Sequence, residues 1–120
     1  MNWFSAGHGP VLVKLDPDRT THELEPPAPP LGVIPEWPQE AYGPCQSEPG
    51  GLLAICSDGI FEAFNPDREQ FDVGRVTAVL DDSRGQVVWD LISELTRRVD
   101  EWQQGREASD DQTIVLIKRR

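Results

Sequence analysis

The stretch Leu52-Leu53-Ala54-Ile55-Cys56-Ser57-Asp58-Gly59-Ile60-Phe61-Glu62-Ala63 organises the predicted fold of this sequence. An apolar run ends abruptly at an acid and a glycine, and a second apolar run follows. Because no polar residue interrupts Ala54, Ile55 and Cys56, the pattern predicts a short strand that is covered on both faces. Such a strand holds a carboxylate rigidly where the backbone leaves the sheet, which makes Asp58 the first candidate functional residue.

A hairpin is the alternative interpretation of the same stretch. Asp-Gly between two apolar runs is typical of a tight β-turn, and residues 52–64 alone favour the hairpin and a metal site about equally. The turn cluster Asn65-Pro66-Asp67 follows directly and leaves little room for a second strand. The metal-site interpretation is therefore preferred.

Length and charge limit the classes of function. A chain of 120 residues forms one domain at most, with a single core. The net charge of −10, from 11 basic and 21 acidic residues, disfavours nucleic acid and anionic membranes as partners, because both need a basic surface. The same charge suits divalent cations, although most acidic proteins carry their charge on solvated surface.

The cysteines and the hydropathy indicate a cytoplasmic protein. Two cysteines make no disulfide framework, so a reducing compartment is expected, with Cys56 as a buried thiol and Cys45 in a loop. The N-terminus has no apolar signal region, and no segment is long enough to span a bilayer.

The first half of the chain predicts strands followed by a connector. Strands are expected at 3–6, 11–15 and 20–24, the last two as an antiparallel pair. From 26 to 38, six of thirteen residues are proline, which predicts an extended connector rather than a ladder. The apolar residues 31–34 within it are expected to pack against the core.

The second half predicts two helices and a final strand. Residues 71–80 have helical spacing of apolar positions, and the Ser83-x-x-Gln86 pattern predicts a capping box that opens the most clearly patterned helix. Gly105 is expected just beyond the end of that helix. Its apolar stripe consists of Val88, Leu91, Ile92, Leu95, Val99 and Trp102. An apolar strand at 113–117 closes the chain.

Acidic residues stand at the tips of two predicted strands. Asp58 follows the first strand, and Asp110 and Asp111 precede the second. If the strands are antiparallel neighbours, about 4.8 Å apart, these carboxylates lie at one end of the sheet. Converging carboxylates repel one another unless a cation neutralises them, and Mg²⁺ or Mn²⁺ prefers oxygen ligands. Two such ions can activate a water for phosphoryl transfer.

Other catalytic arrangements fit the sequence less well. It contains no serine elbow, no cysteine with a plausible histidine partner, no zinc-ligand spacing and no glycine-rich phosphate loop. His8 lies in a glycine-rich turn, where its ring serves either as a proton donor or as a structural group.

Four motifs in their order resemble the SpoIIE-like serine phosphatases, which include the RsbU type and form a bacterial branch of the protein phosphatase 2C superfamily. The resemblance extends over essentially the whole chain. The motifs are Ser5-Ala6-Gly7-His8-Gly9-Pro10, Leu31-Gly32-Val33, the stretch from Gly50 to Ala63, and Asp110-Asp111-Gln112-Thr113.

The resemblance implies an α+β fold, a partial α-β-β-α sandwich in which two C-terminal helices cover one face of antiparallel strands. Residues 1–120 correspond to the C-terminal portion of one such domain. It further implies a two-metal site for Mn²⁺ or Mg²⁺, with Asp58 and Asp110 as catalytic metal ligands. Asp111 stands where the family often has asparagine and is placed second to Asp110. His8 and Gly59 are expected near the site.

The resemblance also implies partners. The family's substrates are phosphoserine or phosphothreonine on anti-anti-sigma proteins of the STAS type, and a sensor domain usually lies upstream. The first half of the family's domain, with its Gly-x-Asp motif, has no counterpart here. The two-metal site is therefore expected to be incomplete, with weak cation binding, little turnover by this chain alone, and self-association. The alternative is a non-catalytic remnant that binds a STAS-type partner.

Overall fold

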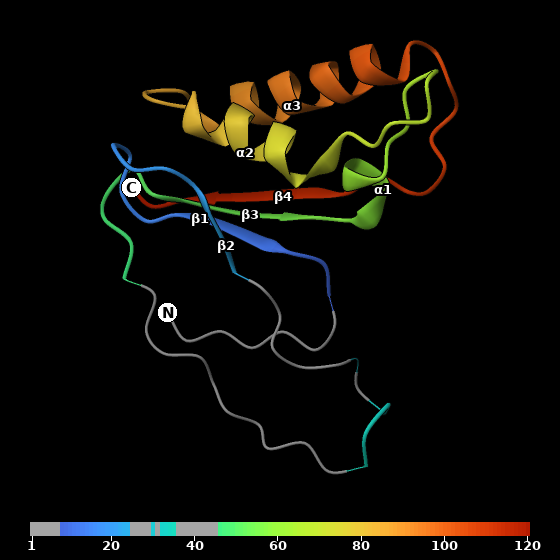
Figure 1. Cartoon of the computed structure of the whole chain (residues 1–120). Coiled ribbons are helices and arrows are strands. Elements are labelled where there is room, and N and C mark those ends of the chain that lie inside the picture. Colours follow the sequence, from blue (N-terminus) through green and yellow to red (C-terminus); the bar gives the residue numbers. More distant parts are fainter. Residues whose placement is uncertain (1–7, 25–29, 31, 36–45) are drawn as a thin grey trace.

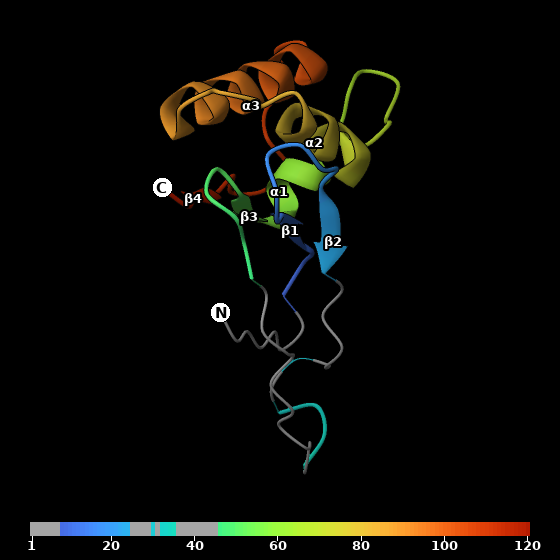
Figure 2. The ribbon, with the colours of Figure 1, turned by 90° about the vertical axis from the view of Figure 1, so that its left-hand side faces the viewer.

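The computed structural model describes residues 8–24, 30, 32–35 and 46–120, which form one antiparallel sheet and three helices. The helices α2 and α3 lie together on one face of the sheet (Figures 1 and 2), which confirms the predicted α+β architecture. The elements in chain order are β1 (Val11–Lys14), β2 (His22–Leu24), β3 (Leu52–Cys56), α1 (Asp58–Phe61), α2 (Asp72–Asp81), α3 (Val88–Gln103) and β4 (Ile114–Lys118).

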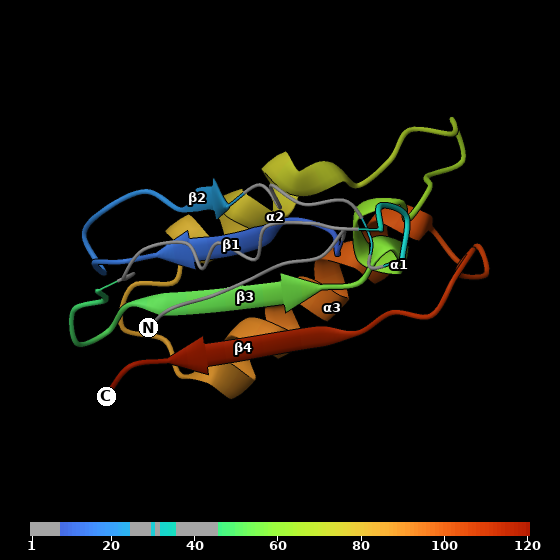
Figure 3. The ribbon, with the colours of Figure 1, turned by 90° about the horizontal axis from the view of Figure 1, so that it is seen from below.

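The strand order β2-β1-β3-β4 places β3 between two antiparallel neighbours (Figure 3). Val11 of β1 pairs with Leu24 of β2 and with Ile55 of β3, so the predicted pair of strands at 11–15 and 20–24 is confirmed. Cys56, the last residue of β3, pairs with Ile114, the first residue of β4. The end of β3 therefore lies beside the starts of both β1 and β4.

The core lies between the sheet and the two long helices. Periodicity predicted both helices correctly, because their apolar positions need burial against the sheet. Only Val88, Ile92 and Trp102 of the stripe on α3 are half-buried rather than buried. The core includes Leu12, Ala54 and Cys56 of the sheet, Ile60 of α1, Val76 and Leu80 of α2, and Leu95 and Val99 of α3.

The prediction that β3 is covered on both faces was wrong. Burial alternates along the strand: Ala54 and Cys56 face the helices and are buried, whereas Leu53 and Ile55 are half-buried. Among the described residues, no helix or strand forms a second layer on that other face. The sheet is consequently apolar on both faces but covered by helices on one.

The capping-box prediction was also wrong. The helix α3 begins at Val88, after an extended Val87 whose side chain makes no cap. The amide of Gln86 instead donates to the carbonyl oxygen of Ser83 at 3.1 Å, so the Ser-x-x-Gln pattern closes a turn after α2. The other end agrees with expectation, because Gly105 follows the left-handed C-cap Gln104 with a φ of 81°.

Of the remaining predictions, some are contradicted by the structure and others concern residues outside the described ranges. Val33 and Ile34 were expected to pack against the core but are 65% and 42% exposed, because they lie in a turn away from the sheet and helices. The Asp-Gly hairpin does not form, since Asp58 begins the short helix α1. The strand predicted at 3–6, residue Leu31 and Cys45 fall outside the described residues.

Lys14 joins the sheet to the end of α2. Its side chain is only 2% exposed, and its ammonium group donates to the carbonyl oxygens of Leu80 and Asp81 at 3.1 and 2.9 Å. Those carbonyl groups belong to the last turn of α2, where no amide of a further helical turn can donate to them. The negative end of the helix dipole lies there and favours a positive charge. The Asp81 carboxylate in turn accepts hydrogen bonds from the amide and hydroxyl of Thr21, both at 2.7 Å.

None of the helices in the described parts is long and apolar enough to cross a membrane.

Candidate functional site

Two short acidic segments lie at the same end of the sheet, as the sequence predicted. They are Ser57–Gly59, at the start of α1, and Asp110–Asp111, before β4, and are called the two acidic turns below. Asp58 is the first residue of α1, two positions after the end of β3, and Asp110 lies four positions before β4 begins. The amide of Ser57 donates to the carbonyl oxygen of Thr113 at 3.0 Å, which continues the β3–β4 ladder one step beyond Cys56 and Ile114. Asp58 and the 110–111 turn are thus neighbours because of the strand register.

The hydroxyl group of Ser57 fastens the two turns together. It donates a hydrogen bond to the carbonyl oxygen of Asp111 at 2.8 Å and accepts one from the amide of Thr113 at 2.9 Å. One side chain therefore satisfies two backbone groups of the opposite turn, 54 and 56 residues away. This arrangement fixes the backbone from Asp111 to Thr113 against the residue that precedes Asp58.

Gly59 lets the two turns come into backbone contact. A β-carbon at this position would lie 2.4 Å from the carbonyl oxygen of Asp111 and 2.9 Å from that of Asp110. Both distances are below any real carbon–oxygen contact, and the obstacle is backbone, which cannot swing away. The glycine that the sequence placed near the site is thus required by packing against the second acidic turn.

Gln112 ties the acidic turns to the end of α3. Its amide nitrogen lies 3.3 Å from the carbonyl oxygen of Gly59 and 3.2 Å from the side-chain oxygen of Gln103, which is 5% exposed. Gln103 is the last residue of α3. The acidic turns are therefore held by side chains from the loop before β4 and from the helix, as well as by the sheet.

The segment from His8 to Pro10, which leads into β1, comes to the same end of the molecule. A β-carbon on Gly9 would lie 3.0 Å from the Asp58 carboxylate oxygen, so the Gly9 backbone borders that carboxylate. The ring of His8 is exposed, and its Nδ1 atom lies 3.3 Å from the carbonyl oxygen of Gly9. Gly9 thus lies beside the Asp58 carboxylate, whereas the nearness of the His8 ring to the site and its role as proton donor or structural group stay predictions.

The three candidate carboxylates, those of Asp58, Asp110 and Asp111, are exposed, and within the described ranges none of them forms an ion pair with lysine, arginine or histidine. One oxygen of Asp110 accepts a hydrogen bond from the amide of Asp111 at 2.7 Å, which orients its carboxylate. Unpaired carboxylate oxygens are the donors that Mg²⁺ and Mn²⁺ prefer.

The donor set is nevertheless small. The part of the chain that the structure describes contains no group of three or more histidine, cysteine, aspartate or glutamate side chains that could hold a metal ion. The carboxylate oxygens of Asp58 and Asp110 are of the donor type that a hard cation prefers, and two of them would leave its other positions to water or to further oxygen atoms. The roles of Asp58, Asp110 and Asp111 as metal ligands stay predictions.

Cys56 takes no part in this chemistry. It lies in the core directly before Ser57, is 1% exposed, and its burial raises the pKa of its thiol to about 11. A thiol with this pKa remains protonated at neutral pH and is a poor nucleophile or metal ligand. The sequence prediction of a buried thiol is confirmed.

Sequence reasoning missed the residues that hold the site together. Ser57, Gln112 and Gln103 make the contacts between the turns, yet none carries a chemistry that marks it in the sequence. The available signal was position, because Ser57 precedes the predicted acid and Gln112 follows the second acidic pair.

Comparison with known proteins gives a consistent family. The sequence matches the family described as Stage II sporulation protein E (SpoIIE) over residues 1–120. Among curated proteins, none matches the chain. The fold is similar to that of a structure of the PP2C phosphatase domain and a fragment of the regulatory domain of SpoIIE from Bacillus subtilis. That comparison has a TM-score of 0.70 and 24% sequence identity, over 98% of this chain and 33% of the other.

Two further solved structures have the same fold. The RsbU and RsbW domains of Rv1364c from Mycobacterium tuberculosis match with a TM-score of 0.64 and 21% identity, over 99% of this chain and 32% of the other. The phosphatase domain of SpoIIE from Bacillus subtilis, presoaked with Mn, matches with a TM-score of 0.64 and 19% identity, over 99% and 55%. The chain thus spans about a third to just over half of the chains that it resembles.

Proposed function

Because this chain belongs to the SpoIIE family, we propose that it is the C-terminal portion of a metal-dependent protein phosphatase. The reaction is hydrolysis of phosphoserine or phosphothreonine: a water oxygen attacks phosphorus, the bond to the side-chain oxygen breaks, and that oxygen takes up a proton. The observation that carries the proposal is the placement of Asp58 and Asp110 on two turns joined by Ser57.

The proposed roles follow from the donor types at the site. Asp58 and Asp110 hold Mn²⁺ or Mg²⁺, and Asp111 is a weaker candidate because it stands where the family often has asparagine; the Asp110 carboxylate is oriented by the amide of Asp111. When bound, such an ion supplies an activated water and stabilises charge on the phosphoryl oxygens. The chain's own contribution is to join the two acidic segments through Ser57 and to orient the Asp110 carboxylate through the amide of Asp111.

The proposed substrate and setting come from the family resemblance. We place the phosphate on a STAS-type anti-anti-sigma protein in the cytoplasm, with an upstream sensor domain controlling the enzyme. A relative whose solved structure holds a phosphatase domain with part of a regulatory domain supports this organisation.

The apolar second face of the sheet supports a further partner, the N-terminal half of the same type of domain. Val115 and Ile117 of β4 are 44% and 55% exposed on this face, beside the half-buried Ile55 and Leu53 with which they pair. Aliphatic side chains on neighbouring strands are the surface that packs against a second sheet about 10 Å away. In the proposal, that second sheet supplies the remaining metal ligands.

The test is complementation. Supplying the N-terminal half of a SpoIIE-family phosphatase domain, fused or in trans, should give Mn²⁺-dependent hydrolysis of an aryl phosphate. Asp58→Asn should abolish it, and Asp90→Asn, on the first turn of α3, should not. Activity that is the same with Asp58→Asn rejects the assignment.

A second candidate function is a non-catalytic protein that keeps the fold to bind a STAS-type partner. The small donor set among the described residues favours it. The same complementation separates the two, because a remnant yields no metal-dependent turnover with any N-terminal half yet still captures a purified STAS-type protein.

A further inference from the structure

The strand β4 forms an open edge of the sheet. It lies at one end of the order β2-β1-β3-β4, and among the described residues no further strand pairs with its outer side (Figure 3). The opposite edge, β2, has only three residues and carries Glu23 at its centre, whereas the five-residue β4 is apolar from Ile114 to Ile117. Because sheet edges are usually protected by short strands, charged side chains or proline, β4 is suited to pair with another strand.

The outward backbone groups of β4 come from alternate residues. The carbonyl oxygen of Thr113 accepts a hydrogen bond from the amide of Ser57 at 3.0 Å, so Thr113 bonds toward β3. The direction of backbone bonding alternates along an antiparallel strand, which turns the N–H and C=O groups of Ile114, Leu116 and Lys118 to the outer edge. A partner strand must therefore pair with these three residues.

Opposite charges stand at the two ends of β4. Asp110 and Asp111 precede the strand, and Arg119 and Arg120 follow it. All four residues are exposed, and in the described parts of the chain none of them forms an ion pair. A strand with this distribution complements an antiparallel copy of itself, because each acidic end then lies beside a basic end.

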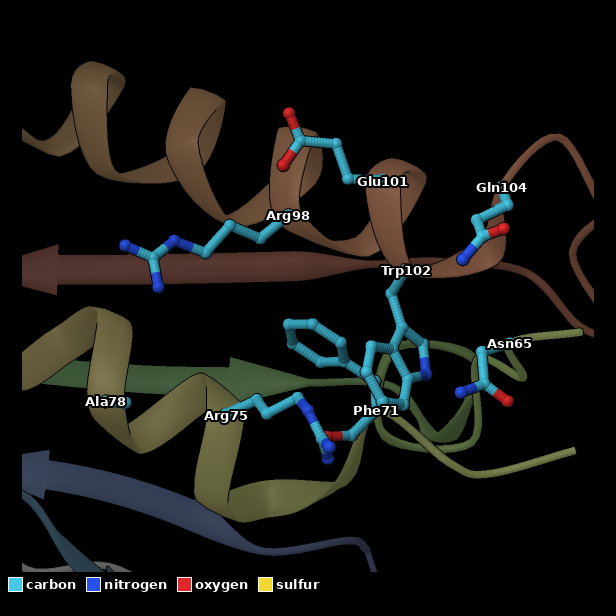
Figure 4. A pocket seen from close by; sticks show the side chains of 8 residues that line it. All are labelled: Asn65, Phe71, Arg75, Ala78, Arg98, Glu101, Trp102 and Gln104. Atoms are coloured by element: carbon cyan, nitrogen blue, oxygen red, sulfur yellow. The ribbon is translucent and has the colours of Figure 1, made fainter. Parts of the chain in front are cut away.

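The charged side chains of the helices are arranged differently. Arg98 and Glu101, which line a hollow between α2 and α3 (Figure 4), pair with Glu94 and Arg97, respectively. These side chains balance one another within α3. Charge complementarity therefore favours the β4 edge over this helical surface as the place where two copies meet.

We infer that two copies of this chain pair antiparallel through their β4 edges, about a two-fold axis at Val115. In this register Ile114 of one copy lies opposite Leu116 of the other, so their outward N–H and C=O groups exchange both hydrogen bonds of an antiparallel pair. Asp111 lies opposite Arg119 of the second copy, and opposite charges in this position stabilise antiparallel sheets.

The neighbouring registers lose this ion pair. The next register that the outward groups allow puts Asp111 opposite Ile117 in one direction, and Arg119 opposite Thr113 in the other. The pairing extends each four-stranded sheet in its own plane and leaves the apolar second face free. The inference is therefore independent of the proposed function, because it uses neither that face nor a bound metal.

Disulfide cross-linking tests the register. In the Cys45→Ser protein, which keeps only the buried Cys56, Val115→Cys should give a cross-linked dimer with oxidised glutathione. Opposing α-carbons of a non-hydrogen-bonded pair are about 4.5 Å apart, which a disulfide spans. Ile117→Cys is the matched control on the same face, because its two copies would be about 14 Å apart and should not cross-link. Equal cross-linking of both variants, as expected from sheets stacked face to face, or none with Val115→Cys, overturns the inference.

Charge exchange tests the ion pairs. Arg119→Glu with Arg120→Glu makes both ends of β4 acidic, and Asp110→Lys with Asp111→Lys makes both ends basic. Each double variant should dimerise about tenfold more weakly than the unaltered chain, because like charges then meet. An equimolar mixture should recover the dimer, since every acidic end again meets a basic one. Sedimentation equilibrium measures the association.

Arg19→Glu with Arg68→Glu is the matched control, because it changes the net charge as much as the other arginine pair does, at exposed positions outside β4 and its flanking residues. It should leave the dimer unchanged, and thermal melting checks that every variant is folded. An unaltered chain that is monomeric at about 100 μM, or folded variants whose mixture does not recover the dimer, contradicts the inference.

Discussion

The hydroxyl group of Ser57 lies 2.8 Å from the carbonyl oxygen of Asp111 and donates a hydrogen bond to it. This contact crosses between two turns that are 54 residues apart in the chain. It makes the position of Asp110 depend on the residue directly before Asp58.

Replacing Ser57 with alanine should therefore loosen the second acidic turn. The Asp111 carbonyl loses its donor and the Thr113 amide loses its acceptor, so the free energy of unfolding should fall by about 1–2 kcal/mol. Urea denaturation measures the loss, and hydrogen exchange at the Thr113 amide should accelerate. Ser57→Thr keeps the hydroxyl and serves as the control; an equal loss of stability with threonine would argue against the hydrogen bonds as the cause.

Gly59→Ala should be strongly destabilising. The added methyl group would meet the Asp111 carbonyl oxygen at 2.4 Å, which forces the two turns apart at a cost of about 2 kcal/mol or more. Gly74→Ala is a matched control within α2, where a β-carbon meets nothing within 4 Å. That change should stabilise the protein by about 0.5–1 kcal/mol, because alanine favours a helix. Similar melting temperatures for both variants would refute the close approach at Gly59.

The sequence predictions that succeeded rested on the periodic spacing of apolar residues. The spacing of Phe71, Val76 and Val79 identified α2 because a helix repeats its buried face every three or four residues. The predictions that failed concern which groups contact a residue in the folded protein. An apolar run cannot reveal what covers Leu53 on its second face, and Ser83-x-x-Gln86 has the same letters in a cap and in a turn.

The geometry of the site was partly predictable. Two acids at the tips of two apolar strands come together whenever those strands are antiparallel neighbours, and β3 and β4 are. The role of Ser57 could not be foreseen, because it depends on the register that aligns Cys56 with Ile114. Lys14 is similar, since only the tertiary structure brings the end of α2 to its ammonium group.

The buried thiol of Cys56 predicts a loss of stability at alkaline pH. Its pKa is about 11 in the folded protein against an ordinary value of 9.0, so the unfolded chain loses the proton first. The contribution of the protonated thiol to the free energy of unfolding is fully present below pH 9. It is lost as the pH rises toward about 11, by about 2–3 kcal/mol in total. Urea denaturation at pH 8 and at about pH 10.5 measures this fall.

The matched pair for that experiment is Cys45→Ser alone and Cys45→Ser combined with Cys56→Ala. Other groups that titrate at high pH act equally on both proteins. The variant that lacks both cysteines should lose less stability between the two pH values. The same pH dependence in both would show that Cys56 contributes nothing.

The apolar second face of the sheet should cause self-association of the isolated chain. Val115→Thr with Ile117→Thr removes apolar surface from residues that are 44% and 55% exposed, and should raise the monomer fraction. Val87→Thr is the control, because Val87 is 59% exposed but precedes α3, outside the sheet. Sizing with light scattering gives the outcome, and a sharp monomer peak for the unaltered chain would contradict the expectation.

The most direct test of the account is the affinity of the chain for Mn²⁺, measured by electron paramagnetic resonance for the unaltered protein, Asp58→Asn, Asp110→Asn and the control Asp90→Asn. If the two acidic turns hold one cation between them, Asp58→Asn and Asp110→Asn should each weaken binding by about tenfold or more, and Asp90→Asn should leave it unchanged. Binding that depends on Asp58 but is untouched by Asp110→Asn would contradict the shared site.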